Sequence, residues 1–479
     1  MTIFDEKPRF PGSADTVNKI NWILSTRGYV AVIAGLTLLS NLFSLEIPVY
    51  TLFAAITVYV CLWGEDLLGL MPIVAMAYFS PSTKNNPGYS EESVFTVGHG
   101  GIYVALLGIT MAAAVIYRII RDRKRFFHHK RPLLSGMLIL AVAYLLGGIG
   151  SEAFPDYWLN HTVFALIQGA SIVLPYLLFT AEVRWEKVRK DYFAWLGCAM
   201  GSVLVLEIFW IYLSGDVVVN GIIERDLIFT GWGMYNNIGA MLAMMIPFTF
   251  YLSVRLHKDW IGMVGGGVFL LFVYLTCSRN SILAATAIYF FCLLLMLYST
   301  QHQKRSRLVP ILSICGVLLV IILFHKQLLL LFDNLLEIGL NPSSRDIIYK
   351  EGLKLFGEAP IFGNSFFSPG YQPWDWSTVN SFSGFFPPRW HNTLVQILAS
   401  CGLVGLCAYC LHTAQVVNLF LSRFTKERVF IACSMAVLIG CSMFDCHFFN
   451  VGPTLFYSTA LAFAECCSRS KVRKLSLNK

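Results

Sequence analysis

Long runs of apolar residues, separated by short polar segments, dominate the chain from residue 29 to about residue 467. Most runs hold roughly 17 to 22 residues, which is enough for a helix to cross a hydrocarbon core of about 30 Å. The pattern predicts an all-α, polytopic membrane protein with about 12 to 14 transmembrane helices. The candidate spans are 29–45, 47–64, 66–80, 98–119, 133–150, 161–181, 192–213, 236–254, 260–276, 281–299, 308–324, 393–418, 428–446 and 453–468.

The longest interruption of this pattern is the segment 325–391, which has 67 residues. Loops beyond about 15 residues are usually functional or disordered. Residues 327–340 are apolar enough to form a helix in the membrane interface, and a second amphipathic helix is predicted to begin near Arg345 and to end by Pro360. The Gly, Pro, Ser and aromatic residues of 363–388 suit a lid that stacks on sugar rings, or an interfacial aromatic belt.

The overall composition agrees with a membrane protein, because 56% of the residues are apolar and 13% are charged, whereas a soluble domain has about 25% charged residues. The net charge is +8, and all but eight of the 36 Lys and Arg residues lie at the two ends or on alternate loops. This asymmetry predicts that the basic loops and both termini are cytoplasmic. Topology and anionic lipid headgroups explain the positive charge, so no nucleic-acid partner is expected. The eight outer cations are Lys84, Arg225, Arg279, Lys326, Arg345, Lys350, Lys354 and Arg389.

These observations predict one transmembrane helical domain rather than several soluble domains. Its predicted parts are a cytoplasmic segment at 1–28, the helical domain at 29–468, the large extracytoplasmic loop at 325–391 within it, and a basic cytoplasmic tail at 469–479.

Two outer arginines stand at unusual positions. Arg279 lies between two apolar runs with almost no loop, and an Arg well inside a span costs roughly 2.5–3.5 kcal/mol. It either snorkels to headgroups or binds an anion. Arg345 opens a predicted helix, where the helix dipole favours an acid. It either pairs with Asp346 or Glu351, or it binds an incoming anion such as phosphate.

His391 is predicted to lie at the outer membrane surface, just before the span 393–418. An imidazole is both a competent base and neutral near pH 7, so it can take the proton from an attacking hydroxyl. An isolated His is more often structural, and both alternatives stay open. Gly402 and Gly405 are predicted to let the following span pack closely behind this position.

Metal ligands and cysteines offer little further chemistry. No outer loop has a DxD pair or clustered carboxylates that would hold Mg²⁺ or Mn²⁺. Asp445 and His447 are only two groups, so hydrogen bonding is the favoured interpretation. No metal and no other cofactor is therefore expected, and arginines would have to stabilise a phosphate. Most of the 13 cysteines lie inside apolar runs, and whether Cys277 and Cys446 form a disulfide is left open.

Three motifs, in this order, resemble the O-antigen ligase and polymerase superfamily of bacterial cell envelopes. They are SRNS (278–281), SSRDIIYKEGLKLFGEAPIFGNSFF (343–367) and RWHNTLVQILASCGLVGL (389–406). In that family an Arg, a second Arg that opens the large periplasmic loop, and a later His-Asn pair recur in this order. GWGMYNNIGAMLAMMIP (231–247) is also similar to a family stretch of small and Asn residues. The resemblance covers less than half of the chain, and family members often have around twelve spans.

The resemblance implies an all-helical membrane glycosyltransferase of the C type in the bacterial cytoplasmic (inner) membrane, with its site facing outward. Family members transfer glycan from an undecaprenyl-diphosphate carrier to an acceptor hydroxyl without a metal ion. The acceptor is another glycan, or a lipid, protein or wall component. Polymerase and ligase differ in this acceptor, which the sequence does not name. A flippase of lipid-linked glycans is the alternative, although no internal repeat typical of transporters is visible.

Carried over by position, the family roles fall on a small set of residues. Arg279 and Arg345 would neutralise the departing diphosphate, and His391 would orient or deprotonate the acceptor. The expected substrate-binding residues around these three are Arg389, Trp390, Asn392, Tyr349 and Asn237.

Overall fold

The structure is all-α and polytopic, which confirms the predicted fold class. The computed structural model describes residues 14–43, 45–76, 100–128, 131–152, 154–214, 217–219, 222–230, 233–299, 345–367, 389–422 and 425–476. Within these ranges, six helices are long and apolar enough to cross a membrane, or seven if a bent pair at the N-terminal end is one span. The protein is therefore a multi-pass membrane protein.

Each predicted span between residues 98 and 299, and each from 393 onward, coincides with a helical segment. The first helices are α1 (Ala14–Leu24), α2 (Arg27–Phe43), α3 (Glu46–Trp63), α4 (Leu70–Met76), α5 (Gly100–Arg121), α6 (Arg123–His128), α7 (Leu134–Leu146), α8 (Phe154–Glu182) and α9 (Tyr192–Ser214). They are followed by α10 (Tyr235–Leu256), the π-helix η2 (Ile261–Gly265), α11 (Gly266–Leu275), α12 (Arg279–Ser299), α15 (Arg345–Glu358), α16 (Thr393–Ser422), α17 (Lys426–Ser442), the 3₁₀ turn η6 (His447–Phe449) and α18 (Val451–Ser476).

Two small antiparallel hairpins precede α10. They are β1 (Val218–Val219) with β2 (Ile222–Ile223), and β3 (Phe229–Thr230) with β4 (Gly233–Met234), with the 3₁₀ turn η1 (Arg225–Leu227) between them. The predicted span 308–324, the predicted interfacial helix 327–340 and most of the predicted lid lie outside the described residues.

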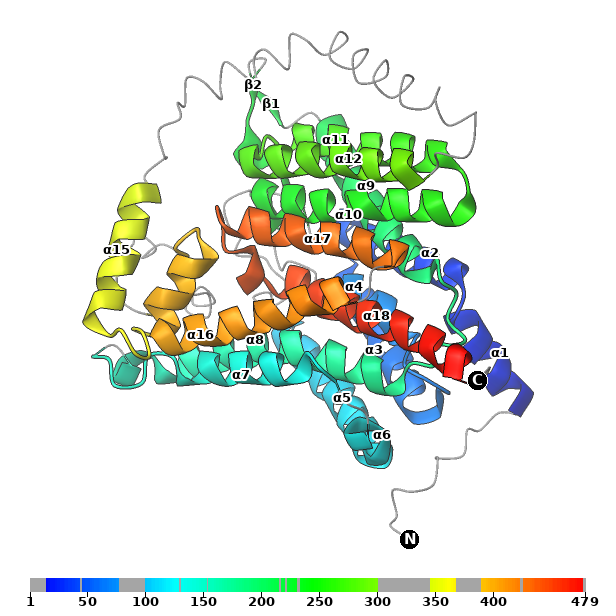
Figure 1. Cartoon of the computed structure of the whole chain (residues 1–479), viewed down its shortest axis with the longest axis horizontal. Helices are drawn as coiled ribbons and strands as arrows, with labels where there is room; N and C mark the ends of the chain where they lie inside the picture. Colours follow the sequence, from blue (N-terminus) through cyan, green and yellow to red (C-terminus); the bar gives the residue numbers. More distant parts are fainter. Residues whose placement is uncertain are drawn as a thin grey trace.

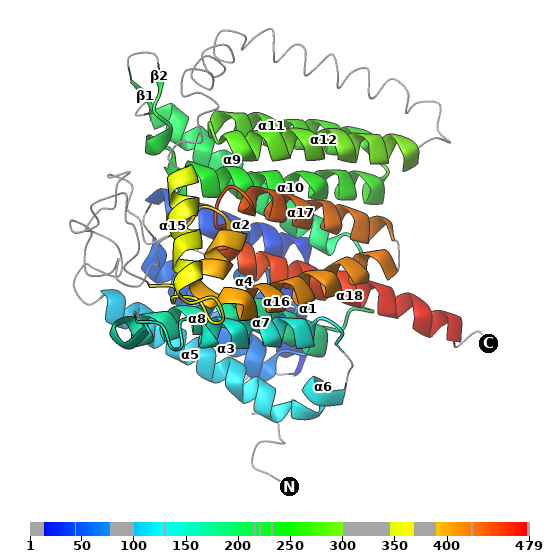
Figure 2. The ribbon, with the colours of Figure 1, turned by 60° about the vertical axis from the view of Figure 1, so that its left-hand side comes forward.

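Helix α10 forms the centre of the bundle. Every residue from Ile238 to Ser253 is buried, and a helix that is apolar all round has to be enclosed by its neighbours. Helices α9, α11, α12 and α17 pack against it, and they run side by side with it in two views (Figures 1 and 2). Helix α8 packs against α7 and α18.

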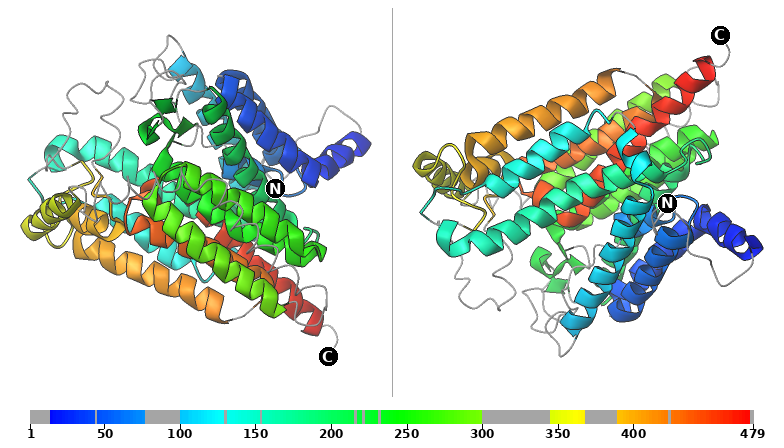
Figure 3. Two further views of the ribbon diagram at one scale, coloured as in Figure 1. Left: turned by 90° about the horizontal axis from the view of Figure 1, so that it is seen from above. Right: turned by 90° about the horizontal axis from the view of Figure 1, so that it is seen from below.

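Helix α15 confirms the second helix predicted in the long outer segment, and it stands across one end of the bundle. Its Ile348 packs against Trp390, Val395 and Ala399 at the start of α16. Gly352 permits this approach, because a Cβ there would meet the Val395 side chain at 2.6 Å. Both views of Figure 3 place α15 and the C-terminal end of α18 at opposite ends of the molecule.

Helix α16 is broken at Gly402, whose φ of 61° and ψ of −155° lie in a region that only glycine adopts readily. The segment after α15 enters this break. On one side of it, the Leu403 amide donates to the Pro360 carbonyl at 2.9 Å. On the other side, the Asn364 amide donates to the Ala399 carbonyl at 2.7 Å. These bonds satisfy backbone groups that have no helical partner, as irregular backbone at membrane depth requires.

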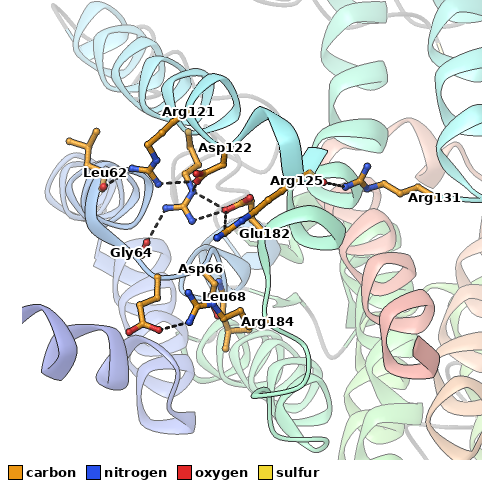
Figure 4. Close-up of polar contacts among 12 residues, drawn as sticks. Leu62, Gly64, Asp66, Leu68, Arg121, Asp122, Arg125, Arg131, Glu182 and Arg184 are labelled. Carbon is orange, nitrogen blue, oxygen red and sulfur yellow. Dashed lines mark hydrogen bonds and ion pairs between the residues drawn. The ribbon is translucent and has the colours of Figure 1, made fainter. Parts of the chain in front are cut away.

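A buried group of charged side chains ties α5 to the C-terminal end of α8 (Figure 4). Glu182 Oε2 accepts from Arg118 Nε and Nη2 at 3.0 and 2.7 Å. Arg118 Nη1 also donates to the Gly64 carbonyl at 2.9 Å, and Arg121 Nη1 donates to the Leu62 carbonyl at 2.8 Å. These basic residues, which the charge pattern assigns to the cytoplasmic side, thus hold the ends of three helices together.

Candidate functional site

The N-terminus of α16 is fixed by Asn392. Its Oδ1 accepts from the amides of Leu394 and Val395 at 2.8 and 3.1 Å, which is how an Asn satisfies the unpaired amides of a first helical turn. Its Nδ2 donates to the Met443 carbonyl at 2.8 Å. Asn392 therefore attaches the start of α16 to the loop that follows α17.

His391 lies beside an acid from that same loop. Its Nδ1 is 3.3 Å from Asp445 Oδ1, and the two side chains are 33% and 11% exposed. The backbone of His391 has a φ of 49°, a left-handed conformation that is uncommon outside glycine. The Tyr349 hydroxyl of α15 donates to the His391 carbonyl at 3.1 Å. His391 is thus held from two sides, by α15 through its backbone and by Asp445 through its ring.

Asp445 carries a negative charge in this arrangement. Burial raises the pKa of its carboxyl, but the contact with His391, the charge of His447 when that ring is protonated and the charge of Arg389 outweigh burial and hold that pKa well below its ordinary range. The Asp445 Oδ1 atom also accepts from the Cys446 amide at 2.7 Å. An ionised carboxylate at this distance attracts the imidazole whenever the ring is protonated.

A second polar chain runs from Arg389 to the start of α10. Arg389 Nη1 donates to Asn450 Oδ1. Asn450 Nδ2 donates to Asn237 Oδ1 at 2.9 Å, and the same oxygen lies 3.1 Å from His447 Nδ1. The predicted residues Arg389 and Asn237 therefore belong to one network, and His447 joins it from η6.

Two further arginines act on Arg279 at the start of α12. The charges of Arg225 and Arg345 both act on the Arg279 guanidinium, so helix α15, the turn η1 and α12 bring their cations to one place. Arg225 also lies over the ring of Tyr235, 5.2 Å from its centroid. Positive charges that act on a third guanidinium in this way favour binding of an anion.

Trp390 occupies a different environment from its neighbours. It is 3% exposed and packs against Ile348 of α15 and Val395 of α16. Its amide donates to Gln396 Oε1 at 3.1 Å. The structure thus shows Trp390 as part of the contact between α15 and α16, and a role in substrate binding stays a prediction.

Sequence reasoning placed most of this group but left out four of its members. Arg225 appeared only as an exception to the charge pattern, and Asp445 and His447 only as two groups suited to hydrogen bonding. The structure confirms this use, because Asp445 accepts from the Cys446 amide and His447 bonds to Asn237. Asn450 gave no signal at all. Among the described residues, no three His, Cys, Asp or Glu side chains are arranged to hold a metal ion. Cys277 and Cys446 are both free thiols.

Comparison with known proteins bears on this group of residues. A family model described as O-antigen ligase matches residues 265–410, a range that includes Arg279, Arg345 and His391. A UPF0761 membrane protein of Aggregatibacter aphrophilus is 29% identical over 157 residues. That match covers 33% of this chain and 50% of the relative, so the chain spans half the length of the curated protein it matches. The chain is therefore a multi-pass membrane protein with an O-antigen ligase domain at residues 265–410.

Proposed function

We propose that this protein transfers an oligosaccharide or polysaccharide from an undecaprenyl-diphosphate carrier to an acceptor hydroxyl. The reaction takes place at the outer face of the bacterial cytoplasmic membrane. The observation that carries this proposal is that the charges of Arg225 and Arg345 act on Arg279, in a protein that also holds His391 3.3 Å from Asp445. The cations suit a diphosphate leaving group, and the imidazole suits a hydroxyl nucleophile.

The proposed step is a substitution at the anomeric carbon of the donor sugar. The acceptor oxygen forms a bond to this carbon, and the bond from the carbon to the diphosphate oxygen breaks, with its electron pair leaving on the diphosphate. Arg279, Arg345 and Arg225 stabilise the charge that develops there. His391 orients the acceptor hydroxyl or takes its proton. Arg389, Asn392, Tyr349 and Asn237 hold these groups in place.

The decisive experiment is incubation of the purified protein with an undecaprenyl-diphosphate oligosaccharide, followed by analysis of product lengths. A ladder of product lengths indicates a polymerase, and a single addition to an added acceptor glycan indicates a ligase.

His391→Ala and Arg345→Ala should each abolish transfer while the protein stays inserted and monodisperse. EDTA should leave the rate unchanged, since the arginines take the place of a metal ion. Full activity of both variants overturns these roles, and movement of intact donor across vesicles without transfer indicates a flippase.

A further inference from the structure

His447 is a second imidazole in the site, and the hydrogen bonds around it determine which ring nitrogen carries the proton. A guanidinium can only donate hydrogen bonds. Arg389 therefore requires the oxygen of the Asn450 side chain to face it, and the Asn450 amide nitrogen then faces Asn237. Because that nitrogen donates, Asn237 presents its oxygen.

The same Asn237 oxygen lies 3.1 Å from His447 Nδ1, so this nitrogen must be the donor. The neutral ring consequently carries its hydrogen on Nδ1 and its free lone pair on Nε2. Within the described part of the chain, Nε2 makes no hydrogen bond. Gly233 leaves room for the Asn237 side chain in this orientation, because a Cβ at position 233 would meet Asn237 Nδ2 at 2.9 Å.

The charges around the ring favour its neutral form before a donor binds. Burial lowers the pKa of His447, the Asp445 carboxylate opposes this shift, and nearby positive charges lower the pKa further. The groups that act on the ring in this way come from three segments and are Asp445, Arg389, His391 and Arg345. A neutral imidazole with a defined tautomer is the form that a general base needs.

We infer that His447, through Nε2, accepts the proton of the acceptor hydroxyl, and that His391, held by Asp445 and Tyr349, positions that hydroxyl. This inference rests on the proposed function. As the acceptor oxygen bonds to the anomeric carbon, its proton moves to Nε2 and the ring becomes an imidazolium. The leaving diphosphate keeps the electron pair of the broken bond, and the imidazolium later returns its proton to this diphosphate or to water.

The donor itself should strengthen this base. A bound diphosphate offsets the positive charges of Arg345 and Arg389, which otherwise disfavour a protonated His447. The pKa of His447 should therefore be higher in the donor complex than in the free protein. Since a base works only when neutral, the acid limb of kcat against pH should lie at higher pH than the acid limb of kcat/KM for the donor.

The test is Asn237→Asp, which places a carboxylate against the His447 Nδ1–H and favours the imidazolium. The rate falls as pH falls through the pKa of the base, so this variant should move the acid limb of kcat/KM up by about one pH unit or more. Asn236→Asp is the matched control, because Asn236 accepts from the Ser278 hydroxyl at 2.9 Å instead of from His447. It should move the limb less.

A second variant guards against a merely structural effect. His447→Ala should lower kcat about 10²–10⁴-fold while binding undecaprenyl diphosphate as the unaltered protein does, and added imidazole should restore part of the lost rate. The inference is overturned if His447→Ala turns over at the wild-type rate, or if active Asn237→Asp shows no shift in the acid limb of its pH profile. It is also overturned if His447→Ala binds the donor but added imidazole does not restore its activity. Absence of any transfer by the unaltered protein overturns the proposed function instead, and the inference with it.

Discussion

At the scale of single residues, Arg225 shows that a cation at an unexpected position in the charge pattern can indicate a candidate anion-binding residue. The charge pattern predicts that it lies on the side of the membrane that is poor in cations. It stands in a turn between two hairpins, and its charge acts on Arg279. A charge-assisted hydrogen bond contributes roughly 1.5–3 kcal/mol, and about 1.4 kcal/mol corresponds to a tenfold change in affinity. Arg225→Ala should therefore weaken binding of undecaprenyl diphosphate about 10- to 100-fold, as measured by equilibrium binding in detergent.

The matched control for Arg225 is Lys354→Ala, which removes an exposed cation from α15 and should change the affinity little. Equal losses in both variants would show that general positive charge, not this group of arginines, attracts the diphosphate. In that case the affinity of the unaltered protein should also fall steeply with salt, because exposed charges are screened.

Site residues close to His391 in the sequence were predictable, whereas those far from it along the chain were not. Arg389 and Asn392 flank His391 in sequence, so one motif identifies them together. Asp445 and His447 reach the site through the packing of α17 against α10 and α16. No local pattern encodes that packing, which is why the sequence suggested a hydrogen-bonded pair there but not a contact with His391.

At the scale of elements, α16 shows the limit of hydropathy. Residues 393–418 were predicted as one span. Its two glycines, Gly402 and Gly405, were predicted to allow close packing, because small residues at this kind of spacing are typical of helix–helix contacts in membranes. The structure instead brings the backbone of Ile361 and Gly363 against Gly402 and breaks the helix there. The break could not be predicted, because it depends on a distant segment, 359–365, that supplies its hydrogen bonds.

Gly402→Ala tests this break. A Cβ at this position would lie 2.5 Å from the Ile361 carbonyl oxygen, and a non-glycine residue in this backbone region costs about 1–3 kcal/mol. The variant should lower the thermal unfolding midpoint and the transfer rate together, because His391 directly precedes the first half of α16. Gly440→Ala in α17 is the control, since a Cβ there meets nothing within 4 Å. An unchanged midpoint for Gly402→Ala would mean that α16 is continuous.

The ion pair between α5 and α8 is an element-scale contact of a different kind. The side chains of Arg118 and Glu182 are 1% and 0% exposed, and removing one partner of a buried pair costs about 3–5 kcal/mol. Glu182→Ala should therefore lower the unfolding midpoint in detergent clearly. Glu65→Ala breaks a pair with Arg184 whose side chains are 44% and 36% exposed, and it should cost no more than about 1 kcal/mol. Similar losses in both variants would show that burial does not govern this contact.

At the scale of the whole molecule, the membrane explains why spans were predictable. Lipid offers no hydrogen bonds to the backbone, so an apolar run of sufficient length must be a helix. The predicted runs accordingly coincide with helices throughout the described residues after position 98. The assembly of the site follows instead from which helices become neighbours, and neighbours in lipid are selected by shape and small residues rather than by hydropathy.

The distribution of Lys and Arg predicts the orientation of the molecule in the membrane, with α15 outside and the loop after α8 inside. Lys354 on α15 is exposed, and Lys187 after α8 is 64% exposed, so a cysteine at either position is accessible to a thiol reagent. In intact spheroplasts a membrane-impermeant maleimide should label Lys354→Cys, whereas Lys187→Cys should be labelled only after permeabilisation. The unaltered protein sets the background, because Cys407 and Cys410 are exposed on α16. The reverse pattern would place His391 and the three arginines on the cytoplasmic side, where a glycan donor that has already crossed the membrane could not reach them.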